Sequence, residues 1–277
     1  MVNNSRAFRD EICIEEGCFG VRDALRNPFY KIPVERQLFQ TNPQRVKAVA
    51  MLEVPEEKTI SNMDSRSWNV VRKHVLDDGL EYVMTEAALV NGGLLPNRST
   101  IADVLIIGIG SGALANYIQY TYPASTIIML ERRAKMARFL LDWFQLYPTP
   151  RFKIYADDVI RFVHELAEKG SKFHVVFFNV CPVSYSHLPC PTARDLPEQM
   201  IHDIAKLVDH TGTFVVNLMT NGIDATGPYE MQKHRLERYF NECLLFAVLS
   251  CSQTFHDRSR LPDAKEFLDP YSTKPKY

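Results

Sequence analysis

The sequence predicts an α/β protein with a doubly wound, mostly parallel sheet and a small N-terminal region that contains short strands. Three observations lead to this fold class. From about residue 103 onward, short apolar runs alternate with helical patterns. A glycine-rich turn follows the first run, and acidic residues end the second and third. With 277 residues, the chain is long enough for one large domain with an appendage.

The alternating part of the chain contains most of the predicted elements. Its first strand, residues 104–107, is entirely apolar, as expected for a strand that is buried on both faces. The helical patterns are long enough to return the chain for parallel pairing. The further predicted strands are 125–130, 152–156, 173–178, 213–218 and 244–249, and the predicted helices are 114–122, 134–146, 158–168, 198–208 and 230–239.

The part of the chain before residue 100 has a different character. Residues 29–34 and 46–52 alternate as strands do, with a turn at Asn42 and Pro43 between them. Residues 68–89 carry apolar side chains at helical spacing. The expected division is an N-terminal region (1–98), a main α/β domain (99–255) and a polar C-terminal tail (256–277).

The amino-acid composition and net charge limit the kinds of partner that the protein is expected to bind. The chain is 46% hydrophobic and 23% charged, which excludes a disordered protein. Its net charge of -1 disfavours a nucleic-acid partner, because such domains carry a basic excess. No apolar run approaches the ~20 residues of a membrane helix, and the N-terminus lacks a signal-peptide core. We therefore expect a cytosolic or nuclear protein, assigned to the cytoplasm, with no membrane partner.

The cysteines and histidines do not indicate a metal site. The six cysteines show no CxxC spacing, and none of the eight histidines forms a pair at ligand spacing. In a cytosolic chain such cysteines are expected to be free thiols.

A glycine motif follows the first strand of the main domain. Gly108, Gly110 and Gly112 stand where the apolar run becomes a helix. Glycine lets the backbone turn sharply and approach a ligand closely, and the following helix offers unpaired N–H groups. The alternative is a plain tight turn, but the strand and helix on either side favour ligand binding.

An acidic residue follows this motif at the distance expected of a ribose ligand. Glu131 ends the second strand, and a carboxylate ~20 residues after such a loop can accept hydrogen bonds from both ribose hydroxyls. The alternative is a structural pair with Arg132 or Arg133. These arginines also suggest the extra phosphate of NADP, which Glu131 would repel.

The next two strands also end in polar residues. We expect Asp157 to accept a hydrogen bond from an adenine amino group and Asp158 to cap the next helix. Asn179 ends the fourth strand and faces the same crevice. The proline-rich segment 181–197, which includes His187, is longer than the usual ~2–6-residue connection and is interpreted as a lid, with a surface excursion as the alternative.

Together these motifs resemble those of the seven-stranded S-adenosylmethionine-dependent methyltransferases, in their spermidine-synthase-like branch. Residues 104–112 are similar to that branch's glycine loop, and residues 151–157 to its third strand. Residues 100–250 resemble most the C-terminal domain of the elongation factor one-alpha lysine and N-terminal methyltransferase family. Residues 27–34 are similar to the small N-terminal β-region of spermidine synthases.

The resemblance implies a Rossmann-like methyltransferase sheet and S-adenosylmethionine as cofactor. It places the three glycines beside the amino-acid and ribose parts of the cofactor, Glu131 on the ribose and Asp157 near the adenine. It also implies a protein amine as substrate (lysine or N-terminus, a translation factor being one candidate), which enters near Asn179. A homodimer through the N-terminal β-region is implied as well.

Three departures from the branch keep alternatives open. Asn179 stands where the branch usually has Asp. An amine of pKa ~10.4 arrives protonated, and Asn is no base, although its side-chain oxygen could orient the amine. One alternative is therefore a catalytically impaired pseudo-methyltransferase that acts as a binding protein. Another is an aminopropyltransferase, which Ser111 disfavours because spermidine synthases usually have Asp there. Finally, residues 244–251 predict one clear strand where the family has a hairpin.

Overall fold

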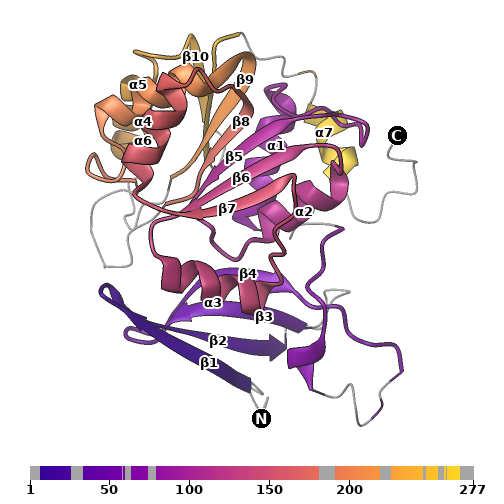
Figure 1. Cartoon of the computed structure of the whole chain (residues 1–277). Helices are drawn as coiled ribbons and strands as arrows, with labels where there is room; N and C mark the ends of the chain where they lie inside the picture. Colours follow the sequence, from indigo (N-terminus) through magenta and orange to yellow (C-terminus); the bar gives the residue numbers. More distant parts are fainter. Residues whose placement is uncertain are drawn as a thin grey trace.

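The computed structural model describes residues 7–25, 34–57, 59, 64–73, 79–180, 191–218, 226–245, 248–254, 259 and 261–268. These residues form two sheets and the helices around them (Figure 1). One sheet has four antiparallel strands in the order β1-β2-β3-β4, and the other has seven in the order β10-β11-β9-β8-β5-β6-β7. The predicted α/β fold with a small N-terminal β-region is therefore confirmed.

The first strand of the seven-stranded sheet along the chain, β5, lies inside the sheet, and later strands lie on both sides of it. β5 pairs in parallel with β6 on one side and with β8 on the other, so the strand order reverses between β5 and β8. Only β11 runs antiparallel to the rest, and β10, which pairs with it in the last hairpin, returns to the common direction. The strands are β5 (Asp103–Ile107), β6 (Thr126–Glu131), β7 (Phe152–Ala156), β8 (Phe173–Phe178), β9 (Val208–Asn217), β10 (Glu242–Leu245) and β11 (Val248–Ser252).

Helices cover both faces of this sheet because its strands are apolar on both sides. In β5, Val104 and Ile106 enter one core cluster, whereas Leu105 and Ile107 enter the other. Figure 1 shows α4, α5 and α6 together on one side of the sheet and α1, α2 and α7 on the other. The helices are α1 (Leu80–Val90), α2 (Ala113–Thr121), α3 (Ala134–Phe144), α4 (Val159–Glu168), α5 (Glu198–Leu207), α6 (Thr226–Leu236) and α7 (Leu261–Leu268).

The four-stranded sheet packs beneath α3 (Figure 1). Its strands are β1 (Ala7–Ile14), β2 (Gly17–Leu25), β3 (Val34–Gln40) and β4 (Arg45–Met51). The buried residues Val21 and Leu38 of this sheet belong to the same core cluster as Phe139 and Leu140 of α3. Helix α3 therefore lies between the two sheets and shares one core with both.

A buried ion pair reinforces this junction. Arg36 is 1% exposed, and its guanidinium donates to the Asp23 carboxylate at 2.8 and 3.2 Å. It also donates to the backbone carbonyls of Ser65, in the short 3-10 helix Ser65–Ser67, and of Trp143 in α3. Because the charge is paired and two backbone carbonyls accept further N–H groups of the guanidinium, the desolvation cost of burying Arg36 is offset.

Several elements differ from the sequence predictions. The β1–β2 hairpin was not predicted, the predicted helix over 68–89 begins only at Leu80, and the single strand predicted over 244–249 is instead the hairpin β10–β11. The expected polar tail contains α7, whose Phe267 is buried. The predicted strand over 29–34 lies outside the described residues except for Val34, as do positions 181–190 of the predicted lid, including His187.

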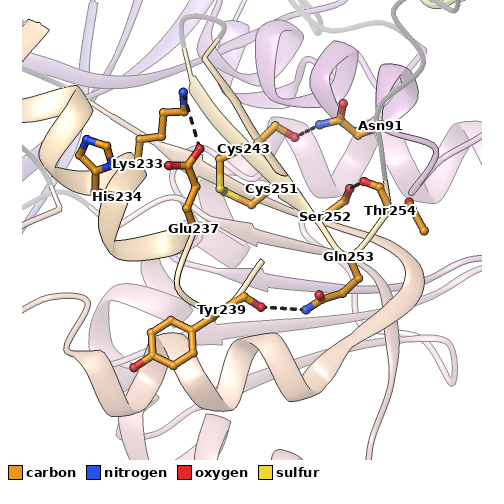
Figure 2. The surroundings of a disulfide bond; sticks show 11 residues. Asn91, Lys233, His234, Glu237, Tyr239, Cys243, Cys251, Ser252, Gln253 and Thr254 are labelled. Carbon is orange, nitrogen blue, oxygen red and sulfur yellow. Dashed lines mark hydrogen bonds and ion pairs between the residues drawn. A yellow bond between two sulfur atoms is a disulfide. The ribbon is translucent and has the colours of Figure 1, made fainter. Parts of the chain in front are cut away.

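Two disulfides join neighbouring strands. Cys13 pairs with Cys18 across β1–β2, and Cys243 with Cys251 across β10–β11 (Figure 2). In both cases the two residues stand directly opposite in the strand register. The prediction of free thiols is therefore wrong for these four cysteines. Disulfides are rare in cytosolic proteins, so the cytoplasmic location stays a prediction that these bonds do not support.

The predicted lack of a membrane span and of a metal site can be compared with the described residues only. None of the helices in that part of the chain has the length and apolar character of a membrane span. Within the same ranges, no group of three or more histidine, cysteine, aspartate or glutamate side chains is arranged to hold a metal ion.

Removing one partner of the buried ion pair tests how strongly it holds the two sheets together. Asp23→Ala leaves the Arg36 charge buried without its carboxylate, and we expect the free energy of unfolding to fall by about 3–5 kcal/mol. Urea denaturation measures this loss. The control is Arg66→Ala, which breaks the exposed pair with Asp64 and should leave the denaturation midpoint unchanged. Equal midpoints for both variants would contradict the assigned importance of the buried pair.

Candidate functional site

The predicted site residues gather at one edge of the seven-stranded sheet. Gly108, Glu131, Asp157 and Asn179 each follow or end one of the parallel strands β5, β6, β7 and β8. Because neighbouring parallel strands end at the same edge, the structure brings these residues to one side of the sheet. This edge contains the point between β5 and β8 where the strand order reverses, the place where open α/β sheets form a ligand crevice.

The glycine loop passes very close to the end of β8. The Gly108 N–H donates to the carbonyl of Leu130, and the Asn179 N–H donates to the carbonyl of Ile107. Gly108 has a φ of +89°, and a Cβ there would overlap the backbone carbonyl of Asn179. At Gly110 (φ +57°) a Cβ would lie 3.3 Å from the side-chain nitrogen of Asn179. Glycine is thus required where the loop approaches Asn179.

Ser111 is directed away from the crevice. It is fully buried, and its hydroxyl donates to the carbonyl of Val49 in β4 at 3.0 Å. The side chain therefore ties the glycine loop to the four-stranded sheet. An ionised aspartate has no proton to donate to this carbonyl, so the local packing selects a hydroxyl at this position.

Glu131 presents a carboxylate that is largely shielded from water. One of its oxygens, Oε1, accepts the backbone N–H of Arg133 at 3.1 Å. Burial raises the pKa of Glu131, and the Arg133 N–H, the charge of Arg132 and the N–H groups of Arg132 and Ile109 oppose that rise. A buried carboxylate beside a glycine loop is suited to accept hydrogen bonds from hydroxyl groups of a bound molecule.

Both arginines after Glu131 are held by a residue that sequence reasoning missed. Glu16, at the turn of the β1–β2 hairpin, binds Arg132 with a distance of 2.7 Å between Oε1 and Nη2, and the same oxygen also contacts Arg133. The Arg133 guanidinium lies farther from Glu131, at 3.9 Å. Since 115 residues separate Glu16 from Glu131 along the chain, no local pattern could have indicated this contact.

The two aspartates after β7 divide their roles. Asp158 accepts the backbone N–H of Arg161 at 2.8 Å and caps α4, which confirms the predicted cap. Asp157 accepts the Asp158 N–H and contacts the Arg161 guanidinium, and this hydrogen bond holds the pKa of Asp157 below its ordinary value. Its carboxylate is thus ionised, and its contact with adenine stays a prediction.

Asn179 is oriented by a second asparagine. Asn217, at the end of β9 and 2% exposed, donates from Nδ2 to Oδ1 of Asn179 at 2.8 Å. The oxygen that we expected to orient an amine therefore already accepts one hydrogen bond, and the amide nitrogen of Asn179 faces Gly110. Asn217 was not predicted as a site residue, although a polar residue ending an apolar strand beside β8 is a usable signal.

Comparison with known proteins agrees with this architecture. No family model matches the chain. Curated relatives are the eEF1A lysine and N-terminal methyltransferase of Xenopus laevis (26% identity; 61% of this chain, 24% of that protein) and its human counterpart (23%; 61% and 26%). The homologue from Drosophila melanogaster is 27% identical over 45% of this chain and 19% of that protein. The matches thus span between about a fifth and a quarter of the length of these relatives.

Solved structures share the fold. Human methyltransferase-like protein 13 in complex with SAH has a TM-score of 0.59 at 19% identity and covers 70% of this chain and 91% of its own. A probable spermidine synthase from Corynebacterium glutamicum has a TM-score of 0.61 at 15% identity, covering 94% and 85%. The fold is thus that of the Rossmann-like methyltransferases and spermidine synthases. The resemblance to the eEF1A lysine and N-terminal methyltransferases is confirmed as a similarity of sequence and fold.

A methyl group at Gly108 tests the close approach of the glycine loop to β8. We expect Gly108→Ala to lower the free energy of unfolding by more than about 2 kcal/mol, because it adds a backbone overlap to the strain of a positive φ. The matched control is Gly170→Ala. Gly170 has a φ of +69° with nothing within 4 Å of an added Cβ, so only about 1 kcal/mol should be lost. Equal losses in thermal unfolding would contradict the close approach.

The burial of Glu131 predicts a pH dependence of stability. Because its pKa is raised in the folded state, its stabilising contribution is fully present below the ordinary value of 4.5 and is lost as the pH rises through the folded pKa. We therefore expect Glu131→Gln to be more stable than the wild type at pH 7, with the difference disappearing below pH 4.5. Urea denaturation across this pH range measures the effect. A variant that is less stable at pH 7 would contradict it.

Proposed function

We propose that this chain binds S-adenosylmethionine and transfers its methyl group to a protein amine, either a lysine or an N-terminus, with a translation factor as the first substrate class to test. The observation that carries the proposal is that the glycine loop and the Glu131 carboxylate lie at the same edge of the sheet, where the strand order reverses between β5 and β8. The similarity to methyltransferases whose names specify eEF1A supports the choice of substrate class.

The residues present fit an adenosyl cofactor. The loop from Gly108 to Gly112 lacks side chains at its three positive-φ positions, so its backbone can approach the amino-acid and ribose parts. Glu131 supplies acceptors for the ribose hydroxyls, and Asp157 an ionised acceptor for the adenine amino group. When bound, the cofactor supplies a sulfonium methyl group that is already electrophilic, so catalysis rests mainly on proximity and orientation.

Asn179 sets the chemistry available to the chain. An incoming amine with a pKa of ~10.4 is protonated at neutral pH, and the amide of Asn179 takes no proton from it. Its nitrogen, turned toward Gly110 by the bond to Asn217, can donate a hydrogen bond at the crevice. The proton of the amine therefore leaves to solvent before methyl transfer, and the reactive fraction rises with pH.

The alternative is a pseudo-methyltransferase that works as a binding protein. This alternative is favoured by Asn179, because an asparagine cannot act as the base for an incoming amine. Aminopropyl transfer is less favoured because Ser111 and Asn179 stand where spermidine synthases usually have acidic residues. A homodimer through the four-stranded sheet, a cytoplasmic location and the lack of nucleic-acid and membrane partners remain proposals from the sequence.

Methylation assays with radiolabelled S-adenosylmethionine, on purified eEF1A and on whole-lysate protein, test the proposal. The wild-type rate should rise about tenfold per pH unit below the pKa of the amine. Asn179→Asp restores a base whose oxygen can still accept the Asn217 hydrogen bond, so we expect a gain of about 10²-fold or more at pH 7 and a flatter pH profile.

The same methylation assay provides a control variant and the results that would contradict the proposed methyl transfer. Asn97→Asp adds the same charge at an exposed loop position before β5, outside the crevice, and should leave the rate unchanged. Binding of S-adenosylhomocysteine without any labelled protein, in the wild type and in Asn179→Asp alike, would establish the binding-protein alternative. Failure to bind it would overturn the methyltransferase proposal and favour a pseudo-methyltransferase that works through protein contacts without the cofactor.

A further inference from the structure

The turn of the β1–β2 hairpin reaches the segment that follows Glu131. Glu16 and its neighbour Glu15 form the two-residue turn between Ile14 and Gly17, which are paired in the strand register. Both guanidinium groups after β6, those of Arg132 and Arg133, contact the same Glu16 oxygen. A turn from the small sheet thus forms part of the surroundings of the carboxylate predicted to bind ribose.

Arg133 is placed between two carboxylates and contacts one of them closely. Its guanidinium binds Glu16, while Nη1 remains 3.9 Å from Oε1 of Glu131. That Glu131 oxygen already accepts the Arg133 backbone N–H. If the guanidinium moved onto Glu131, it would form a charge-assisted pair with the oxygens that ribose hydroxyls require. Glu16 supplies a competing anion in direct contact with the guanidinium, and the charge of the neighbouring Glu15 acts on Arg133 as well, while the distance to Glu131 stays beyond that of a hydrogen bond.

The hairpin is fixed in position at several points. The Cys13–Cys18 disulfide joins its strands one register pair from Ile14 and Gly17. Farther along β1, Asp10 accepts a hydrogen bond from the Trp143 indole of α3 at 3.0 Å. The side chains of Glu16 and Arg133 are only 25% and 27% exposed, so their ion pair is less screened than one at the open surface.

We propose that Glu16 is a positioning residue for cofactor binding: it holds the Arg133 guanidinium off Glu131 and so keeps the Glu131 carboxylate open to the ribose hydroxyls. The inference rests on the proposed function, because it assumes an adenosyl ligand at Glu131. It assigns the four-stranded sheet a part in the cofactor site in addition to its packing against α3.

Calorimetric titration of the full chain with S-adenosylhomocysteine tests the proposal. Glu16→Gln should weaken binding about fivefold, the effect of losing roughly 1 kcal/mol of ion-pair energy. Glu16→Asp keeps the charge and should recover part of the affinity. The control Glu11→Gln removes an exposed carboxylate on β1 of the same hairpin, outside these ion pairs, and should bind as the wild type does.

Two further measurements separate positioning from a general structural role. In the double variant Glu16→Gln with Arg133→Ala, the competing guanidinium is absent, so the affinity should return toward the wild-type value. For the 2′-deoxyribose analogue of the same ligand, which lacks a hydroxyl that Glu131 would bind, Glu16→Gln should cause a much smaller loss. The differences in binding free energy between these variants and between the two ligands measure how strongly Glu16 is coupled to Arg133 and to the ribose hydroxyl.

The contrary outcomes are distinct from those of the proposed function. Unchanged affinity in Glu16→Gln, equal losses for both ligands, or no recovery in the double variant would each overturn the positioning role while wild-type binding stands. Absence of binding by the wild type would overturn the proposed function and this inference with it. Melting temperatures without ligand, equal within the series, confirm that the variants are folded.

Discussion

The close approach of the glycine loop to the end of β8 is the constraint on which the rest of the site depends. β5 and β8 are adjacent parallel strands, and the chain leaves β5 through Gly108 directly against the backbone of Asn179. Any side chain at position 108 would separate these segments. Because they stay in contact, the glycine loop, Glu131 and Asn179 occupy one edge of the sheet and can act on one ligand.

The small sheet contributes to this edge through α3. Its apolar face shares a core with Phe139 and Leu140, and the Arg36 guanidinium spans from β3 to the Trp143 carbonyl. Ser111 adds a direct bond from the glycine loop to β4. These contacts fix the orientation of the small sheet, and the β1–β2 turn is thereby delivered to Arg132 and Arg133. The edge that contains the candidate site is accordingly held in a fixed position relative to the small sheet.

The sequence predicts the parallel core well and the pairings between distant segments poorly. β5, β6 and β8 are recognisable because strands buried on both faces are mostly apolar, whereas the edge strand β7 is largely exposed and carries Lys153. The glycines and acids that follow these strands then indicate the edge. Glu16 escapes this reasoning because its role comes only from an ion pair with residues far along the chain. Asn217 carries a usable signal as a polar residue that ends an apolar strand, but the periodicity of the sequence does not show its partner Asn179 across the sheet. The disulfides were missed because a cytosolic location was expected, in which cysteines are free thiols, and because cysteine spacing does not reveal which strands are paired.

The Cys243–Cys251 disulfide has a consequence for the outer edge of the large sheet. β10 is the last strand on that side, and an edge strand presents unpaired backbone groups on which another chain can add a strand. The covalent bond keeps this four-residue strand in register with β11 and prevents it from peeling away to expose a longer edge. At the opposite edge β7 carries Lys153, a charge of the kind that discourages such addition. The two ends of the sheet thus differ in chemistry: a covalent bond keeps the edge strand β10 in place, and a charge on β7 discourages strand addition.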